Sequence, residues 1–219
     1  DRYGDNIIGL VTDARFPRNG EKDPAAGMKL AEYLHRRSPH VPVIVESQET
    51  ANRGLAEMAG YTFLDKNSKT LPIDLRKAVS RRFGFGDFIV CYPGDDRELM
   101  RFRKLKDLQN GIFDIPSDLL MSLCTDNSIS RWLYSRALFP IADALKNQAC
   151  TDVDDEQIVR RIVFECIVKY RRMKNRGVVA VFKRENYDRY SNFARIGQGS
   201  MGGKGRGLAF IDQIIKRNP

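Results

Sequence analysis

The chain has 219 residues, of which 42% are hydrophobic and 30% are charged, a composition typical of globular proteins. It contains no apolar run of about 18 residues, so we expect no membrane-spanning helix and no membrane partner. The formal net charge of +9 permits nucleic-acid binding, but the basic residues are dispersed, so a nucleic-acid partner is not expected.

The first part of the chain alternates short apolar runs with helical patterns. The apolar runs predict strands over residues 7–11, 41–45 and 61–64, and the first is expected to be buried on both faces. Residues 18–24 are rich in turn formers and predict a polar loop. One helix is expected after each strand. The first carries Met28, Ala31 and Leu34 on one face, and the second spans residues 50–58. The third begins at Pro72, with Ile73, Leu75 and Val79 directed inward. This alternation predicts an α/β fold with a parallel sheet.

The three predicted strands deliver Asp13, Ser47 and Lys66 at their carboxyl ends. Because the carboxyl ends of parallel strands meet at one edge of a sheet, we expect these side chains to lie close together. The set suits a phosphoryl group on the carboxylate, with the hydroxyl and the ammonium binding its oxygens. Taken singly, Asp13 and Ser47 are also typical of turn and helix caps, and Lys66 of a surface charge. Their coincidence at successive strand ends favours the phosphoryl site.

Residues 6–80 resemble the receiver domain of two-component response regulators, a flavodoxin-like fold, of which they would be strands 3–5. The resemblance rests on Asp13 followed by Pro17, on Val41-Pro42-Val43-Ile44-Val45-Glu46-Ser47, and on Ala59-Gly60-Tyr61 before Phe63-Leu64-Asp65-Lys66. It implies that Asp13 is the phosphoacceptor and a ligand of Mg²⁺, and that Ser47 is the switch hydroxyl. It also implies that Lys66 senses the phosphoryl group and that Phe63 is the aromatic switch. The implied partner is a histidine kinase or another phosphohistidine donor.

The sequence departs from the receiver pattern in several places. Asn67 stands where receivers usually have proline, Gln48 stands where they have a small residue, and the loop from Asp13 to Gly27 is longer than usual. The first two strands and helices of a receiver, with the acidic pair that holds Mg²⁺, have no counterpart in this sequence. We therefore expect the chain to begin inside the domain, with an upstream strand that ends in paired carboxylates.

Phe83-Gly84-Phe85-Gly86 marks the end of the partial receiver, residues 1–82, and the start of a helical connector, residues 83–176. An apolar stretch at 88–90 and a turn at 93–96 precede the expected helices. One helical stripe is formed by Leu99, Phe102, Leu105 and Leu108, and another by Leu119, Leu120 and Leu123. A helix over 130–145 is expected to kink at Pro140, and a long helix follows the acidic residues 152–155.

Residues 177–219 combine a predicted strand over 178–182 with a glycine-rich segment, residues 196–207, that runs into an apolar helix. Backbone amides in such a segment can cradle phosphates beside a lysine, although a flexible linker is the alternative. The segment resembles the start of the ATP-grasp-like nucleotide-binding domain of phosphoenolpyruvate synthases and pyruvate phosphate dikinases. Residues 130–136 are similar to the helical segment that precedes this domain. The resemblance implies that Gly202, Gly203 and Lys204 contact nucleotide phosphates, with ATP a cofactor of the complete parent protein only.

These observations predict a regulatory protein in which phosphoryl acceptance on Asp13 controls a fused phosphotransferase similar to phosphoenolpyruvate synthase. No turnover is expected of this chain itself, and a homodimer is compatible with the resemblance. One alternative is a DNA-binding response regulator, with residues 128–137 as recognition helix and Arg131 and Arg136 on it. Another is a pseudo-receiver that takes no phosphate and serves for docking.

The cysteines bear on the compartment. They are far apart and lack metal-ligand spacing, which favours unpaired thiols in a reducing, cytoplasmic setting over disulfides: Cys91, Cys124, Cys150 and Cys166.

Overall fold

The structure, a computed structural model, describes residues 7–18, 20–92, 97–146, 155–175, 178–188, 190 and 193–217. Two compact units divide the chain, Asp1–Glu156 and Gln157–Pro219. The functional boundaries expected near residues 82 and 176 stay predictions.

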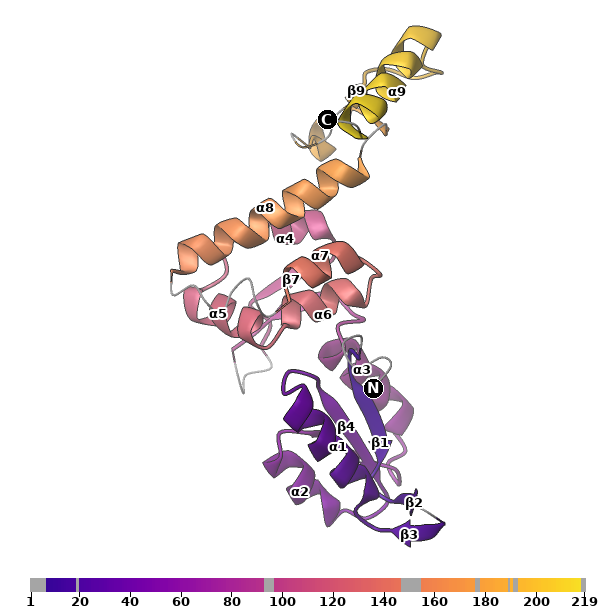
Figure 1. Ribbon diagram of the computed structural model, residues 1–219, viewed down its shortest axis with the longest axis vertical. Helices are drawn as coiled ribbons and strands as arrows, with labels where there is room; N and C mark the ends of the chain where they lie inside the picture. The colour runs from indigo at the N-terminus through magenta and orange to yellow at the C-terminus, as the bar shows by residue number, and fades with distance from the viewer. Residues whose placement is uncertain are drawn as a thin grey trace. The chain divides into compact units, whose positions relative to one another are not determined.

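The N-terminal part of the first unit is built around a three-stranded parallel sheet (Figure 1). Its strands, in the order β1-β4-β5, are β1 (Leu10–Asp13), β4 (Val43–Ser47) and β5 (Thr62–Asp65). Asp13 is in register with Glu46, and Ser47 with Asp65, so the three strands end at the same edge. The α/β class with a parallel sheet and alternating helices is confirmed.

Helices cover both faces of this sheet (Figure 1). On one face, α1 (Ala26–Arg37) and α2 (Asn52–Met58) contribute to a core cluster with β4 and β5 residues: Ala14, Ala31, Val43, Val45, Ala56, Tyr61 and Phe63. On the other face, α3 (Leu71–Arg82) packs its apolar stripe against Ile44, Leu64 and Phe83. The central strand β4 is thereby buried between two layers of helices, as expected for a parallel strand.

The first strand and the third helix differ in detail from the prediction. β1 begins at Leu10, not Ile7. Val11 is 42% exposed, so the prediction that this strand is buried on both faces was wrong. Val11 is paired with Ile44, but α3 packs over Ile44 and Leu64 and leaves the outer strand uncovered. Ile73 is also exposed, because Leu75 and Val79 form the inward stripe of α3 and Ile73 lies on another side of the helix.

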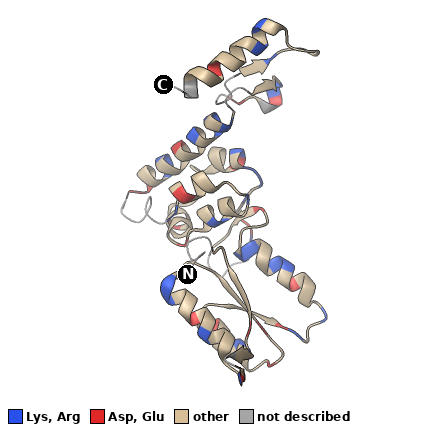
Figure 2. Ribbon diagram, turned by 45° about the vertical axis from the view of Figure 1, so that its right-hand side comes forward, with Lys and Arg blue, Asp and Glu red and all other residues tan. Residues whose placement is uncertain are grey.

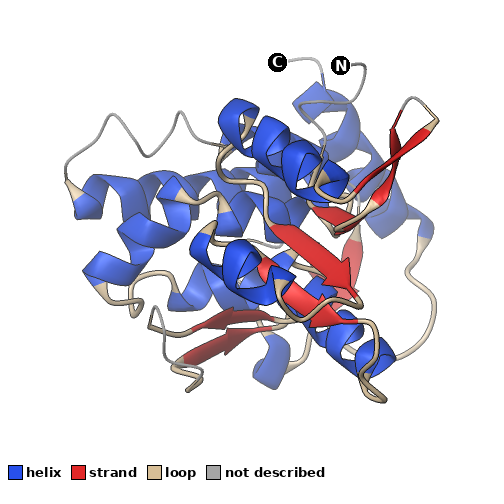
Figure 3. Cartoon of the chain, turned by 90° about the horizontal axis from the view of Figure 1, so that it is seen from below, coloured by secondary structure: helices blue, strands red, loops and turns tan. Residues whose placement is uncertain are grey.

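The predicted loop at residues 18–24 contains a short antiparallel hairpin instead (Figure 3). Its strands are β2 (Phe16–Arg18) and β3 (Glu21–Asp23), with Gly20 at a φ of 87°, which suits glycine. Asp23 accepts hydrogen bonds from the Ala25 amide and from Lys29 Nζ, both at the start of α1. These bonds tie the hairpin to the helix.

The rest of the first unit is mainly helical after one antiparallel strand pair (Figure 3). The strands are β6 (Phe88–Val90) and β7 (Met100–Phe102), and the helices are α4 (Leu105–Gly111), α5 (Ser117–Thr125), α6 (Ser128–Tyr134) and α7 (Phe139–Ala144). The helical stripe expected from Leu99 to Leu108 was therefore wrong at Phe102, which pairs with Phe88. The expected kinked helix is two helices, separated at Ala137 with a φ of 55°, and Pro140 lies in the first turn of α7. The turn expected at 93–96 lies outside the described residues.

The boundary at residues 83–86 forms a joint that is packed and hydrogen-bonded against Trp132 and Arg136. Arg136 donates hydrogen bonds to the carbonyls of Gly84, at 2.9 Å, and Gly86, at 2.6 Å, and its guanidinium lies 4.1 Å from the centre of the Trp132 ring. Trp132 Nε1 also donates to the Gly86 carbonyl, at 3.2 Å. Gly84 has a φ of 78°, and a Cβ there would lie 2.8 Å from Trp132 Cα. The joint therefore requires glycine at this position.

The second unit begins within the first turn of α8 (Glu156–Lys174) and contains β8 (Val179–Val181), the 3₁₀ turn η2 (Arg184–Asn186), β9 (Phe193–Arg195) and α9 (Gly203–Arg217). β8 confirms the strand predicted at 178–182 and pairs with β9 in parallel. The acidic residues 152–154 lie outside the described residues.

The described residues also show how charges are distributed, whether a helix could cross a membrane, and whether the cysteines are paired in disulfides. Basic and acidic residues alternate over several helices (Figure 2). In the part of the chain that the structure describes, no helix is long and apolar enough to cross a membrane. Among the same residues, Cys91, Cys124 and Cys166 form no disulfide.

Candidate functional site

An ion pair joins the ends of the two outer strands of the sheet. Lys66 Nζ, just after β5, lies 2.5 Å from Asp13 Oδ2 at the end of β1. Both residues line an open cavity whose other lining residues are the last residue of β4 and residues of the loops after β1 and β4: Ser47, Arg15, Gln48 and Glu49. The structure thus brings together all three residues predicted at the strand ends, around a hollow that is mostly polar.

The position of Asp13 depends on the close approach of α1. The Gly27 amide, in the first turn of α1, donates to the Ala14 carbonyl at 3.0 Å. A Cβ on residue 27 would lie only 1.9 Å from the Asp13 carbonyl oxygen. The Ala14 amide in turn donates to the Glu46 carbonyl at 2.8 Å. Glycine at 27 is therefore what allows the helix to hold the end of β1 in place.

Ser47 is buried and held by its own loop. Its Oγ accepts hydrogen bonds from the Glu49 amide and from Asn52 Nδ2, each at 3.0 Å. Both bonds use the hydroxyl oxygen as acceptor. The hydroxyl proton is therefore the group that Ser47 can offer to an oxygen of a ligand in the cavity.

The electrostatics keep Asp13 ionised. Burial by itself raises the pKa of Asp13, but the hydrogen bonds from Lys66 and the Arg15 amide, together with both positive charges, outweigh it and bring the pKa below its ordinary value. An ionised carboxylate is the form that can act as a nucleophile.

We expect the Lys66→Met variant to raise the pKa of Asp13 above its wild-type value, because the burial effect remains while the opposing charge is gone. In the wild type the pair stabilises the fold above the unfolded-state pKa of Asp13, and this contribution disappears as the pH falls through the lower folded-state pKa. The side-chain carboxyl resonance of Asp13, followed by ¹³C NMR against pH, measures the change. An unchanged titration would show that Lys66 does not act on Asp13 in solution.

Two of the cavity residues were not predicted. Arg15 Nη1 and Glu49 Oε1 form an ion pair of 3.1 Å at the cavity, between exposed side chains. Their signal in the sequence is only their position, two residues beyond Asp13 and Ser47, which is common for charged loop residues. Gln48 also lines the cavity, and its carbonyl accepts a hydrogen bond of 2.8 Å from Asn67 Nδ2. Two of the departures from the receiver pattern, Gln48 and Asn67, are thus hydrogen-bonded to each other.

Phe63, implied to be an aromatic switch, lies in the core cluster beneath α1 and α2. The Arg53 guanidinium lies 4.9 Å from the centre of its ring. Phe63 does not line the cavity that contains Asp13, as far as the described residues show.

The residues that the structure describes do not make up a magnesium site. The described residues contain no group of three or more histidine, cysteine, aspartate or glutamate side chains that could hold a metal ion. Asp13, the Mg²⁺ ligand implied by the resemblance, shares its cavity with one other carboxylate, Glu49, which is paired with Arg15.

The glycine-rich segment belongs to the second unit. Gly203 and Lys204 are the first two residues of α9, and Gly202 directly precedes it. Gly197 and Gly199 have φ values of 93° and 106°, and Arg206 Nε donates to the Met201 carbonyl at 2.9 Å. The segment before α9 therefore has a defined local conformation, with Lys204 exposed in the first turn.

Comparisons with protein-family models, with curated proteins and with solved structures give no match for this chain. The assignment of a function therefore rests on the residues of the site.

Proposed function

We propose that the strand-end cavity accepts a phosphoryl group on Asp13 and that the protein is a signal-transduction regulator of the response-regulator type. The observation that carries the proposal is the 2.5 Å contact between Lys66 Nζ and Asp13 Oδ2, in a cavity that Ser47 also lines. A carboxylate, an ammonium and a hydroxyl from successive strand ends provide a nucleophile and two donors for phosphoryl oxygens.

The proposed donor is a phosphohistidine, such as that of a histidine kinase. One Oδ atom of Asp13 attacks phosphorus, the phosphorus–nitrogen bond breaks, and its electron pair returns to the imidazole nitrogen, which then takes up a proton. Lys66 exchanges its bond to the carboxylate for bonds to phosphoryl oxygens, and Ser47 donates its hydroxyl proton to another. In the receivers that the sequence resembles, Mg²⁺ assists this transfer; the residues that the structure describes do not complete its site.

The proposed output is control of a fused phosphotransferase similar to phosphoenolpyruvate synthase. Its support is the glycine-rich segment that leads into α9, with Gly202, Gly203 and Lys204 at a helix start, where backbone amides favour phosphate. ATP would be the cofactor of the complete parent protein. Transfer from a histidine kinase, and the lack of a disulfide among the described Cys91, Cys124 and Cys166, support a cytoplasmic setting for this function.

One observation favours the pseudo-receiver as a second candidate. Gln48 lines the cavity at a position where receivers have a small residue, and its backbone carbonyl is held by the Asn67 side-chain amide. It could occupy the space of a phosphoryl oxygen. The DNA-binding alternative has less support, because Arg131 and Arg136 both bind backbone carbonyls of the first unit, those of His40, Gly84 and Gly86 among them.

Reaction with acetyl phosphate and magnesium tests the proposal. We expect the product of the complete reading frame to gain the mass of one phosphoryl group, and Asp13→Asn to gain none, since the amide keeps the shape but is not a nucleophile. Asp65→Asn is the matched control, because Asp65 ends β5 beside Lys66 but accepts its bond from the Asn67 amide. Equal labelling of wild type and Asp13→Asn would place the phosphoryl group on another residue and contradict the proposal, and no labelling at all would favour the pseudo-receiver.

A further inference from the structure

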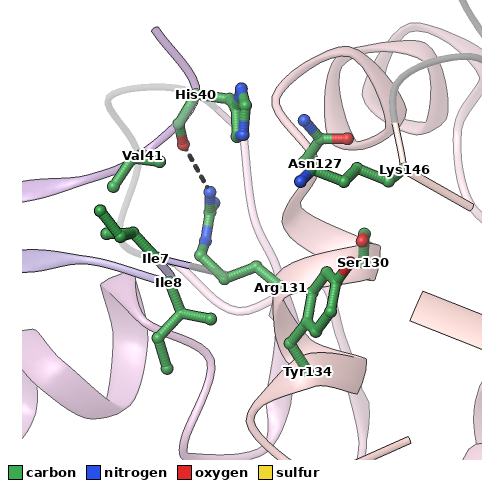
Figure 4. Close-up of a pocket in the computed structure, with 9 residues that line it drawn as sticks. All are labelled: Ile7, Ile8, His40, Val41, Asn127, Ser130, Arg131, Tyr134 and Lys146. Atoms are coloured by element: carbon green, nitrogen blue, oxygen red, sulfur yellow. Dashed lines mark hydrogen bonds between the residues drawn. The ribbon is translucent and has the colours of Figure 1, made fainter. Parts of the chain in front are cut away.

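A second cavity lies at the opposite end of the sheet from Asp13 (Figure 4). His40 and Val41 precede β4, whereas Ser47 ends it, so roughly 15 Å of strand separates the two cavities. On one side the second cavity is lined by residues of the sheet end: Ile7, Ile8, His40 and Val41. On the other side it is lined by residues in or just before α6, and by Lys146 just after α7: Asn127, Ser130, Arg131, Tyr134 and Lys146.

Positive charge predominates in this second cavity. Among the described residues, the charges that act on the His40 ring are the cations Lys146 and Arg131 and one carboxylate, Asp126. Asp126 is engaged at the start of α6, where its Oδ1 accepts a hydrogen bond from the Ser128 amide at 2.8 Å. Figure 4 shows Arg131 and Lys146 both directed toward the cavity beside His40.

Arg131 has neutral hydrogen-bond partners in this cavity. Its Nη1 donates to the carbonyls of His40, at 2.7 Å, and Asp126, at 3.2 Å, and its Nη2 donates to Ser128 Oγ at 3.1 Å. Burial lowers the pKa of Arg131, because none of the described carboxylates is hydrogen-bonded to its guanidinium to offset the loss of water. A guanidinium has about five N–H groups, and these three bonds leave Arg131 with further donors for a ligand.

His40 is held in its neutral form by the same surroundings. Burial lowers its pKa most, and Lys146 and Arg131 lower it further, against the opposing effect of Asp126. A bound anion would reverse the effect of the two cations and favour the protonated ring. The cavity would then hold three positive groups around one negative ligand.

We propose that this second cavity binds a small phosphate dianion, either inorganic phosphate or the phosphoryl end of a phosphate monoester, through Arg131, Lys146 and His40. Two permanent cations and one ring that can be protonated match a dianion better than a monoanion. The apolar wall formed by Ile7, Ile8 and Val41 would face the organic part of a monoester. The site is independent of the chemistry proposed for Asp13.

A titration with inorganic phosphate, followed by NMR of the histidine rings, tests this proposal. The chain has only 2 histidines, so His35 serves as an internal reference. We expect phosphate to shift the His40 resonances saturably and to raise the pKa of His40, while His35 stays unchanged. Two histidines that stay unmoved, or that move alike, would overturn the proposal.

Variants locate the ion. Lys146→Gln should weaken phosphate binding about tenfold or more, the usual effect of removing one charged hydrogen bond. Lys69→Gln, at an exposed lysine before α3, should bind as the wild type does. Lys66→Met should also leave the His40 response intact. Loss of the response in Lys66→Met, or unchanged affinity in Lys146→Gln, would place the ion elsewhere and contradict the proposal.

Phenyl phosphate identifies the source of the dianion. Binding at least about tenfold tighter than inorganic phosphate, with the same His40 shift, would assign the site to a phosphate monoester whose organic part meets the apolar wall. Equal affinity of the two ligands would assign it to inorganic phosphate.

Discussion

Trp132→Ala is expected to lower the free energy of unfolding by about 3–5 kcal/mol, the usual cost of truncating a buried aromatic residue. Trp132 is 1% exposed, and the centre of its ring lies 5.6 Å from the centre of the Phe88 ring. The truncation also removes the surface on which Arg136 stacks and the bond to the Gly86 carbonyl. Chemical denaturation followed by far-UV circular dichroism measures the loss.

Trp132→Phe is the matched variant, because it keeps an aromatic ring and removes the indole N–H. We expect it to cost less than Trp132→Ala, with about 0.5–1.5 kcal/mol from the lost indole hydrogen bond, because Arg136 Nη2 still donates to the Gly86 carbonyl. An alanine variant as stable as the wild type would show that the joint between residues 83–86 and Trp132 is not formed in solution.

Gly27→Ala is expected to destabilise the protein by about 1–3 kcal/mol or more, because the new methyl group would meet backbone atoms that cannot rotate away. The Cβ would lie 1.9 Å from the Asp13 carbonyl oxygen, so α1 or the end of β1 must shift. We therefore expect phosphoryl labelling of Asp13 to fall together with stability. Denaturation and the acetyl phosphate reaction measure the two effects on the same variant.

Gly54→Ala provides the contrast. Gly54 lies within α2, and a Cβ there would meet no atom within 4 Å. Alanine should stabilise the helix by roughly 0.5–1 kcal/mol, because glycine costs more backbone entropy. If the two variants behaved alike, the close approach of Gly27 to Asp13 would not exist in solution.

The grouping of Asp13, Ser47 and Lys66 could be predicted because it depends on one rule. Each residue follows a short apolar run, and parallel strands end at the same edge of a sheet. Composition and order along the chain were enough for this inference. The close approach of Gly27 could not be predicted in this way, because it depends on how α1 packs against β1.

The strand β7 was mispredicted because its pattern is ambiguous. Leu99, Phe102, Leu105 and Leu108 recur at every third residue, which is also the spacing of a helical stripe. The pairing of Phe88 with Phe102, whose rings lie 6.2 Å apart, decides in favour of a strand. A partner distant in sequence thus overrides the local periodicity.

The break between α6 and α7 depends likewise on contacts across the fold. Pro140 was expected to bend a continuous helix, but it begins a new one after Ala137 adopts a left-handed conformation. Ser130 Oγ donates to the Ala142 carbonyl at 2.7 Å, which holds the two helices against each other. A hydrogen bond between neighbouring helices of this kind leaves no periodic signal in the sequence.

The position of the phosphoryl group tests the central claim most directly. Borohydride reduces an acyl phosphate of aspartate to homoserine, which marks the modified residue for peptide mass spectrometry. After reaction of the complete reading-frame product with acetyl phosphate and magnesium, we predict homoserine at position 13, and none if hydroxylamine is added first. Homoserine at another aspartate, or at none while Asp13 remains intact, would contradict the assignment of Asp13 as the phosphoacceptor.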